Sequence, residues 1–119
     1  MTKLTWIEEL NNTEFESSSG YTDQFRSFYN LFNREMRAFL KSVGATKIDI
    51  YRMHFGASGF FTLGDKIWYF SLGDVRWDAS FLIRTAKDYK DYIGGSNSFL
   101  PVDNEKDFVL GFSKRVLGR

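Results

Sequence analysis

The stretch YTDQFRSFYNLFNREMRAFLKSVG, residues 21–44, decides the fold because its apolar residues recur every three or four positions. This spacing places them on one side of an α-helix with about 3.6 residues per turn. The apolar side consists of Phe25, Phe28, Tyr29, Phe32, Met36, Phe39, Leu40 and Val43. We predict a long amphipathic helix here, with Phe28, Phe32 and Phe39 nearly fully buried against a sheet.

The opposite side of the predicted helix is basic. It carries Arg26, Arg34, Arg37 and Lys41, with the amides of Asn30 and Asn33 beside them. Such a stripe suits hydrogen bonding to the phosphates of a nucleic acid. The simpler interpretation is a solvated face, which any amphipathic surface helix needs. A solvated face more often mixes both signs of charge, so both interpretations stay open.

Capping residues set the boundaries of the predicted helices. Thr22 is the expected N-cap of the long helix, and Gly44 is the glycine expected just after its end. Upstream, Thr5 and Glu8 have the spacing of a capping box, which predicts a short helix over about residues 6–11. The stretch between the two helices, residues 13–20, contains Ser17-Ser18-Ser19-Gly20 and is expected to be a mobile connection.

After Thr46 the hydrophobic period changes to two, which is typical of strands. Four strands are predicted, over residues 47–55, 60–63, 66–72 and 79–86. Turns are expected at Gly56-Ala57-Ser58-Gly59, Gly64-Asp65 and Gly73-Asp74. These connections are too short for parallel crossovers, so the pattern favours an antiparallel meander.

The C-terminal part combines a long connection with a helix. Residues 87–101 have no clear period, which is typical of a functional or wrapping loop. Asp103 is the expected N-cap of a last helix, in which Phe108, Val109, Phe112 and Val116 share a face. We therefore predict one α+β domain over residues 1–119, with a short N-terminal helix, a long amphipathic helix, a four-stranded antiparallel meander and a C-terminal helix.

Composition excludes several classes of protein. The chain has 16 Lys and Arg against 15 Asp and Glu, a net charge of +1, which argues against a strongly basic binder of nucleic acid. It has no cysteine and one histidine, so disulfides, thiolate metal sites and multi-histidine metal sites are excluded. No cofactor is expected. Met1 to Trp6 lack the apolar run of a signal peptide, and a cytoplasmic protein without a membrane span is expected.

Residues for catalysis are sparse. His54 and Ser58 lie four positions apart without the G-x-S-x-G pattern, and Asp74 and Asp78 flank Arg76 as turn residues would. We assign no catalytic residue, and an enzyme of unknown class stays the third alternative.

A second alternative is a binder of single-stranded nucleic acid. The predicted sheet is rich in rings, and Tyr51 and Trp68 with Arg52 and Arg84 could stack on bases and neutralise phosphates. Core packing is the simpler use of such rings.

Residues 84–92, RTAKDYKDY, with GGSN at 94–97, resemble a block in small accessory proteins of bacteriophages and conjugative elements. The resemblance implies that anti-defence inhibitors, including anti-CRISPR proteins, are candidates. Such proteins would act by occluding a surface of a host nucleoprotein, in the cytoplasm of a bacterial cell.

The interpretation we favour is a non-enzymatic binding protein whose partner is a host protein or nucleoprotein. Direct contact with nucleic acid stays open, no membrane is expected, and the sequence does not indicate an oligomeric state. The partner-binding surface is predicted to combine the basic side of the long helix with an accessible loop at residues 87–97. Its candidate residues are Arg26, Arg34, Arg37, Lys41, Arg84, Lys87, Tyr89, Lys90, Tyr92 and Asn97.

Overall fold

The computed structural model describes residues 3–17 and 20–119, so Met1, Thr2, Ser18 and Ser19, two of them in the expected mobile connection, lie outside the described residues. The α+β class is as predicted. In chain order the described elements are α1 (Thr5–Asn12), α2 (Asp23–Ser42), β1 (Thr46–Met53), β2 (Gly56–Leu63), β3 (Lys66–Leu72), β4 (Phe81–Ala86), β5 (Ser98–Leu100), α3 (Glu105–Phe112) and a final π-helical segment η1 (Ser113–Leu117).

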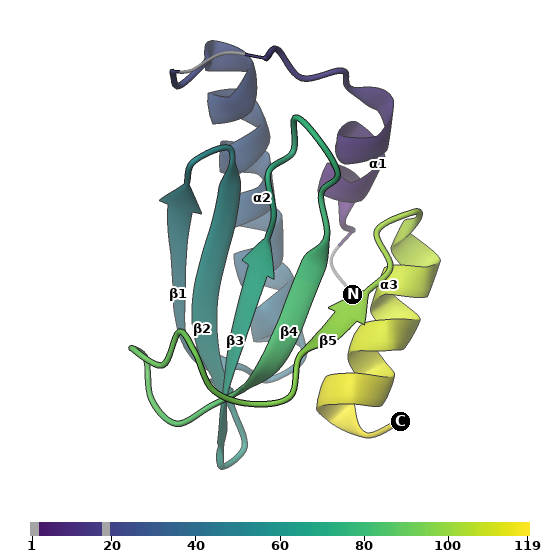
Figure 1. The fold of residues 1–119 in the computed structure, drawn as a ribbon. Helices are drawn as coiled ribbons and strands as arrows, with labels where there is room; N and C mark the ends of the chain where they lie inside the picture. Colours follow the sequence, from purple (N-terminus) through teal and green to yellow (C-terminus); the bar gives the residue numbers. More distant parts are fainter. Residues whose placement is uncertain (1–2, 18–19) are drawn as a thin grey trace.

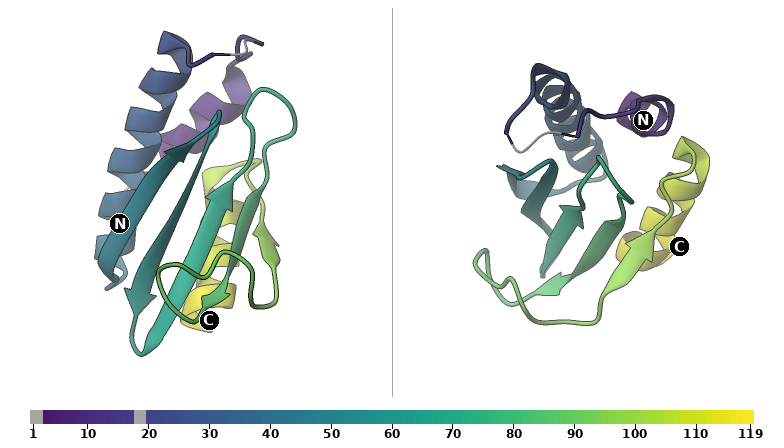
Figure 2. Two further views of the ribbon diagram at one scale, coloured as in Figure 1. Left: turned by 60° about the vertical axis from the view of Figure 1, so that its left-hand side comes forward. Right: turned by 45° about the horizontal axis from the view of Figure 1, so that its top comes forward.

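The five strands form one antiparallel sheet in the order β1-β2-β3-β4-β5, which is the predicted meander with one strand added. The helices of the described residues pack on one face of this sheet, with α2 behind β1 and β2 and α3 beside β5 (Figure 1). The chain between β4 and β5 passes over the opposite face (Figure 2). The sheet therefore has a helix-covered face and an open face.

Helix α2 confirms the prediction made from its spacing. The Thr22 hydroxyl accepts a hydrogen bond from the Phe25 N–H at 3.1 Å, as an N-cap does. Gly44 follows the helix with φ +98°, a conformation that glycine adopts at little cost. Phe28, Phe32 and Phe39 are buried, as expected.

Aromatic rings from all the layers meet in the core. The Trp6 ring lies 4.8 Å from the ring of Phe32 and 5.5 Å from that of Phe108. The Phe70 ring of β3 lies 6.4 Å from Phe32 and stacks on Phe81 at 5.7 Å. Helices from both ends of the chain are thus joined to the sheet through edge-on and stacked ring contacts.

The predicted capping box at Thr5 and Glu8 is wrong. The Thr5 hydroxyl donates to Glu35 Oε2 at 2.6 Å, and the Trp6 N–H donates to Glu35 Oε1 at 2.7 Å. The Leu4 N–H donates to the Glu105 carboxylate. Carboxylates of α2 and α3 therefore accept from two backbone N–H groups at the start of α1, those of Leu4 and Trp6, which no local pattern could indicate.

The expected turn at Gly56-Ala57-Ser58-Gly59 is the buried first half of β2. The actual turn is His54-Phe55, and Phe55 adopts φ +54° with its ring buried 5.2 Å from Phe25. Gly59 is a glycine for packing reasons, because a Cβ there would lie 2.2 Å from the Asp49 carbonyl oxygen and 2.7 Å from the ring of Phe70. In the sequence, a glycine required for packing cannot be distinguished from a glycine in a turn.

The prediction missed β5 and misplaced the start of α3. Strand β5 has only three residues, and its pairing of Phe99 with Leu82 joins positions far apart in the chain. The N-cap is Asn104 instead of Asp103, since the Asn104 side chain accepts from the Asp107 N–H at 2.8 Å. Gly111 is tolerated inside α3 because a Cβ would lie only 3.3 Å from Leu100, so glycine allows α3 to approach β5.

Candidate functional site

Two rows of side chains build the open face of the sheet. Opposite residues of antiparallel strands share a face, so each row follows from the register. The first row is Asp49, Phe60, Tyr69 and Arg84, on β1 to β4. The second row is Tyr51, Ser58, Ser71, Leu82 and Phe99, across all five strands.

Residues 87–97, called the crossing loop from here on, pass over the open face of the sheet (Figure 1). The hydroxyls of Tyr89 and Thr62 share a hydrogen bond of 2.6 Å. The rings of Tyr89 and Tyr92 lie 5.5 and 5.3 Å from the ring of Phe60, which is fully buried beneath them. The crossing loop thus covers the first row and leaves Tyr51 and Phe99, at the two ends of the second row, exposed.

Arg84 fixes the crossing loop from below. Its side chain is 2% exposed, and its guanidinium lies 4.5 Å above the ring of Tyr69. Nη2 donates to the Asp91 carbonyl at 2.8 Å, and Nη1 lies 3.9 Å from the Asp91 carboxylate. A basic residue of the predicted binding surface therefore acts as an internal anchor.

Asp91 organises the crossing loop from within. Its carboxylate accepts hydrogen bonds from the backbone N–H groups of Lys87, Gly94 and Ile93. These bonds, led by the one from Lys87, lower the pKa of Asp91 from 3.8 to about 2, with a smaller contribution from the Arg84 charge. Gly95 has φ +89° and approaches the Thr85 carbonyl so closely that a Cβ would lie 2.6 Å from its oxygen. The loop has a defined backbone with specific internal partners.

The uncovered part of the open face is apolar. Five large apolar side chains on this side are substantially exposed, and we call them the open-face patch: Tyr51 (44% exposed), Met53 (50%), Tyr92 (57%), Ile93 (95%) and Phe99 (62%). Partial burial raises the pKa of Tyr51, and the nearby Asp49 carboxylate and the Tyr92 hydroxyl raise it further. Every residue of the second row is uncharged. An apolar patch of this kind marks an interaction site more often than a solvated surface.

Helix α2, which carries the basic stripe, lies across the sheet from the crossing loop (Figure 2). Arg26 pairs with Asp23 at 3.2 Å, and Arg37 donates to Asn33 at 2.8 Å and to the Ile48 carbonyl at 3.1 Å. Arg34 and Lys41 are exposed. The structure therefore does not bring together the two halves of the predicted binding surface.

The loop residues of the predicted surface have different surroundings. Arg84 and Tyr89 are engaged in the anchoring contacts, whereas Lys87, Lys90 and Asn97 are exposed together with Tyr92. Tyr89 was expected to be accessible and is instead partly buried, because its hydroxyl is bound to Thr62 and its ring packs on Phe60.

The residues of the nucleic-acid alternative are also separated. Trp68 is buried on the helix-covered face, where the Arg115 guanidinium lies 5.0 Å from its ring. Arg52 lies 3.9 Å above the ring of Tyr21, also on the helix side. Of that set, Tyr51 alone contributes an exposed ring to the open face.

Sequence reasoning missed Met53, Ile93 and Phe99. Phe99 was missed because β5 is too short to show a period. Met53 did show a signal, since it alternates with Tyr51 along β1. Ile93 is an isolated apolar residue among polar neighbours, a pattern that alone indicates nothing about exposure.

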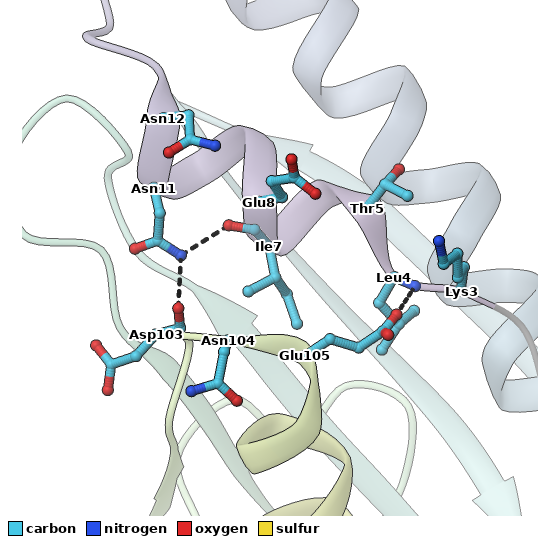
Figure 3. A pocket seen from close by; sticks show the side chains of 10 residues that line it. All are labelled: Lys3, Leu4, Thr5, Ile7, Glu8, Asn11, Asn12, Asp103, Asn104 and Glu105. Carbon is cyan, nitrogen blue, oxygen red and sulfur yellow. Dashed lines mark hydrogen bonds between the residues drawn. The ribbon is translucent and has the colours of Figure 1, made fainter.

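A cleft of about 280 Å³ lies between α1 and the start of α3 (Figure 3). Asn11 Nδ2 donates at 2.7 Å to the carbonyls of both Ile7 and Val102, and Glu105 accepts from Leu4. These partners are internal, so the cleft is the junction that fastens α1 to α3.

The groups considered for catalysis are dispersed. His54 is exposed in the β1–β2 turn, while Ser58 is buried opposite Tyr51. Asp74 forms an ion pair of 2.6 Å with Arg76, whose hydrogen bonds lower the pKa of Asp74. Among residues 3–17 and 20–119, no group of three His, Cys, Asp or Glu side chains is placed to hold a metal ion.

Comparisons with protein-family models, with curated proteins and with solved structures found no match. Within the part of the chain that the structure describes, no helix is both long enough and apolar enough to cross a membrane.

Proposed function

We propose that this is a non-enzymatic binding protein that contacts a partner protein through the open-face patch. The observation that carries the proposal is the concentration of five exposed apolar side chains beside an uncharged row of the sheet. The cores of protein–protein interfaces are depleted in charge and enriched in Tyr, Phe and Met. Tyr51, Met53 and Phe99 supply those residue types on a sheet, where strand pairing limits their movement.

A protein fits this patch better than a nucleic acid. Single-strand binders combine stacking rings with cations that follow the backbone. Here Arg84 is buried against Tyr69 and Asp91, and Lys87 and Lys90 alternate with Asp88 and Asp91. The rings of the patch therefore lack the adjacent basic track that phosphates need.

The likeness of residues 84–97 to phage accessory proteins supports a partner inside a bacterial cell. Occlusion of that partner's surface is the mode of action that suits a protein with an exposed apolar face. The basic stripe of α2 does not adjoin this face, so a nucleoprotein partner would need a second contact for its phosphates.

Site-specific photocrosslinking tests the proposal. A photoreactive phenylalanine analogue replaces Tyr51 or Phe99 in cells that express the protein, and replaces Trp77 or Leu110 as controls. The controls are also exposed and apolar, but Trp77 lies in the connection between β3 and β4 and Leu110 lies on α3. We expect a discrete crosslinked protein band from positions 51 and 99 that survives nuclease, and none from positions 77 and 110. Equal crosslinking at all four positions, or products that nuclease removes, would contradict the proposal.

A further inference from the structure

We propose that the open-face patch is covered by a second copy of this chain, in a two-fold dimer in which each crossing loop packs on the uncovered half of the partner's sheet. This inference rests on the proposed function, because it names the partner for the same patch. Three observations carry it: the stepped shape of the face, its apolar area, and its distribution of charge.

The crossing loop raises one half of the open face, which we call the ridge, and leaves the other half, which we call the recess, without a covering segment. The crossing loop, with Tyr92 and Ile93, stands above the sheet at one end of the strands (Figure 2). At the other half, the middle of the second row consists of two small residues, the buried Ser58 on β2 and the half-buried Ser71 on β3. A surface that combines a ridge with a recess of the same chemistry is complementary to a rotated copy of itself.

Two copies of this face fit together when they are related by a two-fold axis that is parallel to the face and perpendicular to the strands. In such a dimer each strand faces the same strand of the second copy, and the two strands run in opposite directions. The ridge at one end of the strands therefore meets the recess at the other end in the second copy. The Tyr92 ring lies 5.3 Å from Phe60 and 5.9 Å from Tyr69, which places it over β2 and β3. Ile93, the next residue, would therefore lie above Ser58 and Ser71 of the second copy.

The apolar area is close to what such a dimer requires. Each aromatic side chain has about 150–250 Å² to bury, so the exposed parts of Tyr51, Tyr92 and Phe99 sum to roughly 300 Å². Met53 and Ile93 bring the total to roughly 500 Å². A standard interface buries about 800 Å² per partner, of which about 65% is apolar in homodimers, or about 500 Å².

The charges of the face permit contact between identical copies. Every residue of the second row is uncharged, so no like charges meet in the recess. In the crossing loop Lys87 and Lys90 are balanced by Asp88 and Asp91, and the whole chain carries a net charge of +1. Electrostatic repulsion between two copies is therefore small.

Engineered cysteines test the arrangement directly, because the natural chain has none. Two single variants, Ser71→Cys and Ile93→Cys, are purified, mixed and oxidised, so that any disulfide between positions 71 and 93 joins two molecules. We expect this heterodimer to be the main product, identified by mass spectrometry of the linked peptides. The matched control mixes Ile93→Cys with Leu110→Cys, a position exposed on α3, and should give little product.

Analytical ultracentrifugation of the cysteine-free protein supplies the equilibrium readout. We expect a concentration-dependent monomer–dimer equilibrium that Tyr51→Ala and Phe99→Ala each weaken by about tenfold or more. Trp77→Ala should leave it unchanged. A monomer at every concentration, or a dimer without the 71–93 disulfide, overturns the proposed arrangement.

The two proposals fail in different ways. If the purified protein is monomeric while positions 51 and 99 crosslink a different protein in cells, the second copy is rejected and the proposed function stands. If those positions crosslink nothing and the protein is monomeric, both proposals are rejected.

Discussion

At the scale of single residues, Phe32 holds a central position in the core. It is fully buried, with the rings of Trp6, Phe28 and Phe70 within 6.4 Å. We expect Phe32→Ala to lower the free energy of unfolding by about 3–5 kcal/mol, because it removes ring contacts and leaves a cavity. Urea denaturation measures this loss. Leu110→Ala, on the solvent side of α3, should change the value by about 0.5 kcal/mol, and an equal loss in both variants would contradict the assigned core.

Gly59 tests a different residue-scale effect. A Cβ at this position would meet the Asp49 carbonyl oxygen at 2.2 Å and the ring of Phe70 at 2.7 Å, so Gly59→Ala must displace the backbone of β1 as well as a buried side chain. We expect a loss of about 1–3 kcal/mol in the free energy of unfolding, as for other overpacked cores. Gly20→Ala is the control, since nothing lies within 4 Å of a Cβ there. Equal midpoints for the two variants would show that Gly59 is not required for packing.

At this scale, the features that could be predicted from the sequence are those that depend on the spacing of neighbouring residues. The buried side of α2, the Thr22 cap and the glycine at position 44 follow from patterns within a few turns of helix. Glu35 could not be predicted as the acceptor for Thr5 and Trp6, because the two helices meet only after the chain folds. The same holds for Gly59, which is required by the close approach of the β1 backbone and of the Phe70 ring on β3.

At the scale of elements, the crossing loop depends on the Asp91 carboxylate. The pKa of Asp91 is about 2 in the folded protein against an ordinary 3.8, so ionisation stabilises the fold. This contribution is complete above the ordinary pKa and is lost as the pH falls toward 2. We expect the unfolding free energy to decrease less from pH 4 to pH 2 in Asp91→Asn than in the parent, as measured by urea denaturation at each pH. Parallel pH profiles would rule out this role for Asp91.

The crossing loop also shows which elements and which part of the site could not be predicted from the sequence. Its length and lack of period indicated a wrapping or functional segment, and it does wrap the sheet. Strand β5 was absorbed into it, because three residues carry no period and their pairing with β4 is non-local. Without β5, Phe99 could not be placed at the end of the second row. The open-face patch therefore could not be predicted as a surface, although the sequence indicates two of its members, Tyr51 and Tyr92, as candidate binding residues.

At the scale of the whole molecule, the sheet separates two surfaces of different chemistry. The open-face patch lies on one side of the sheet, and helix α2 lies on the other side (Figure 2), with Arg34 and Lys41 exposed on it. The sequence suggested a single surface made of the basic helix and the loop. Spacing along the chain defines which side of a helix is polar, but the meander determines that this side faces away from residues 87–97.

This separation predicts that the basic stripe and the open-face patch act independently. Arg34→Gln with Lys41→Gln removes two exposed charges while keeping helix propensity, and leaves the hydrogen bonds of Arg37 intact. We expect the double variant to crosslink from position 51 as the parent does, and both proteins to show little affinity for single-stranded oligonucleotides at physiological salt. Fluorescence anisotropy over a salt series measures that affinity. If the parent instead binds, and the double variant lowers the log–log salt slope by about 1.4, at about 0.7 for each lost contact, then the stripe holds phosphates. That result would make the stripe of α2 a second binding surface, on the side of the sheet opposite the protein partner.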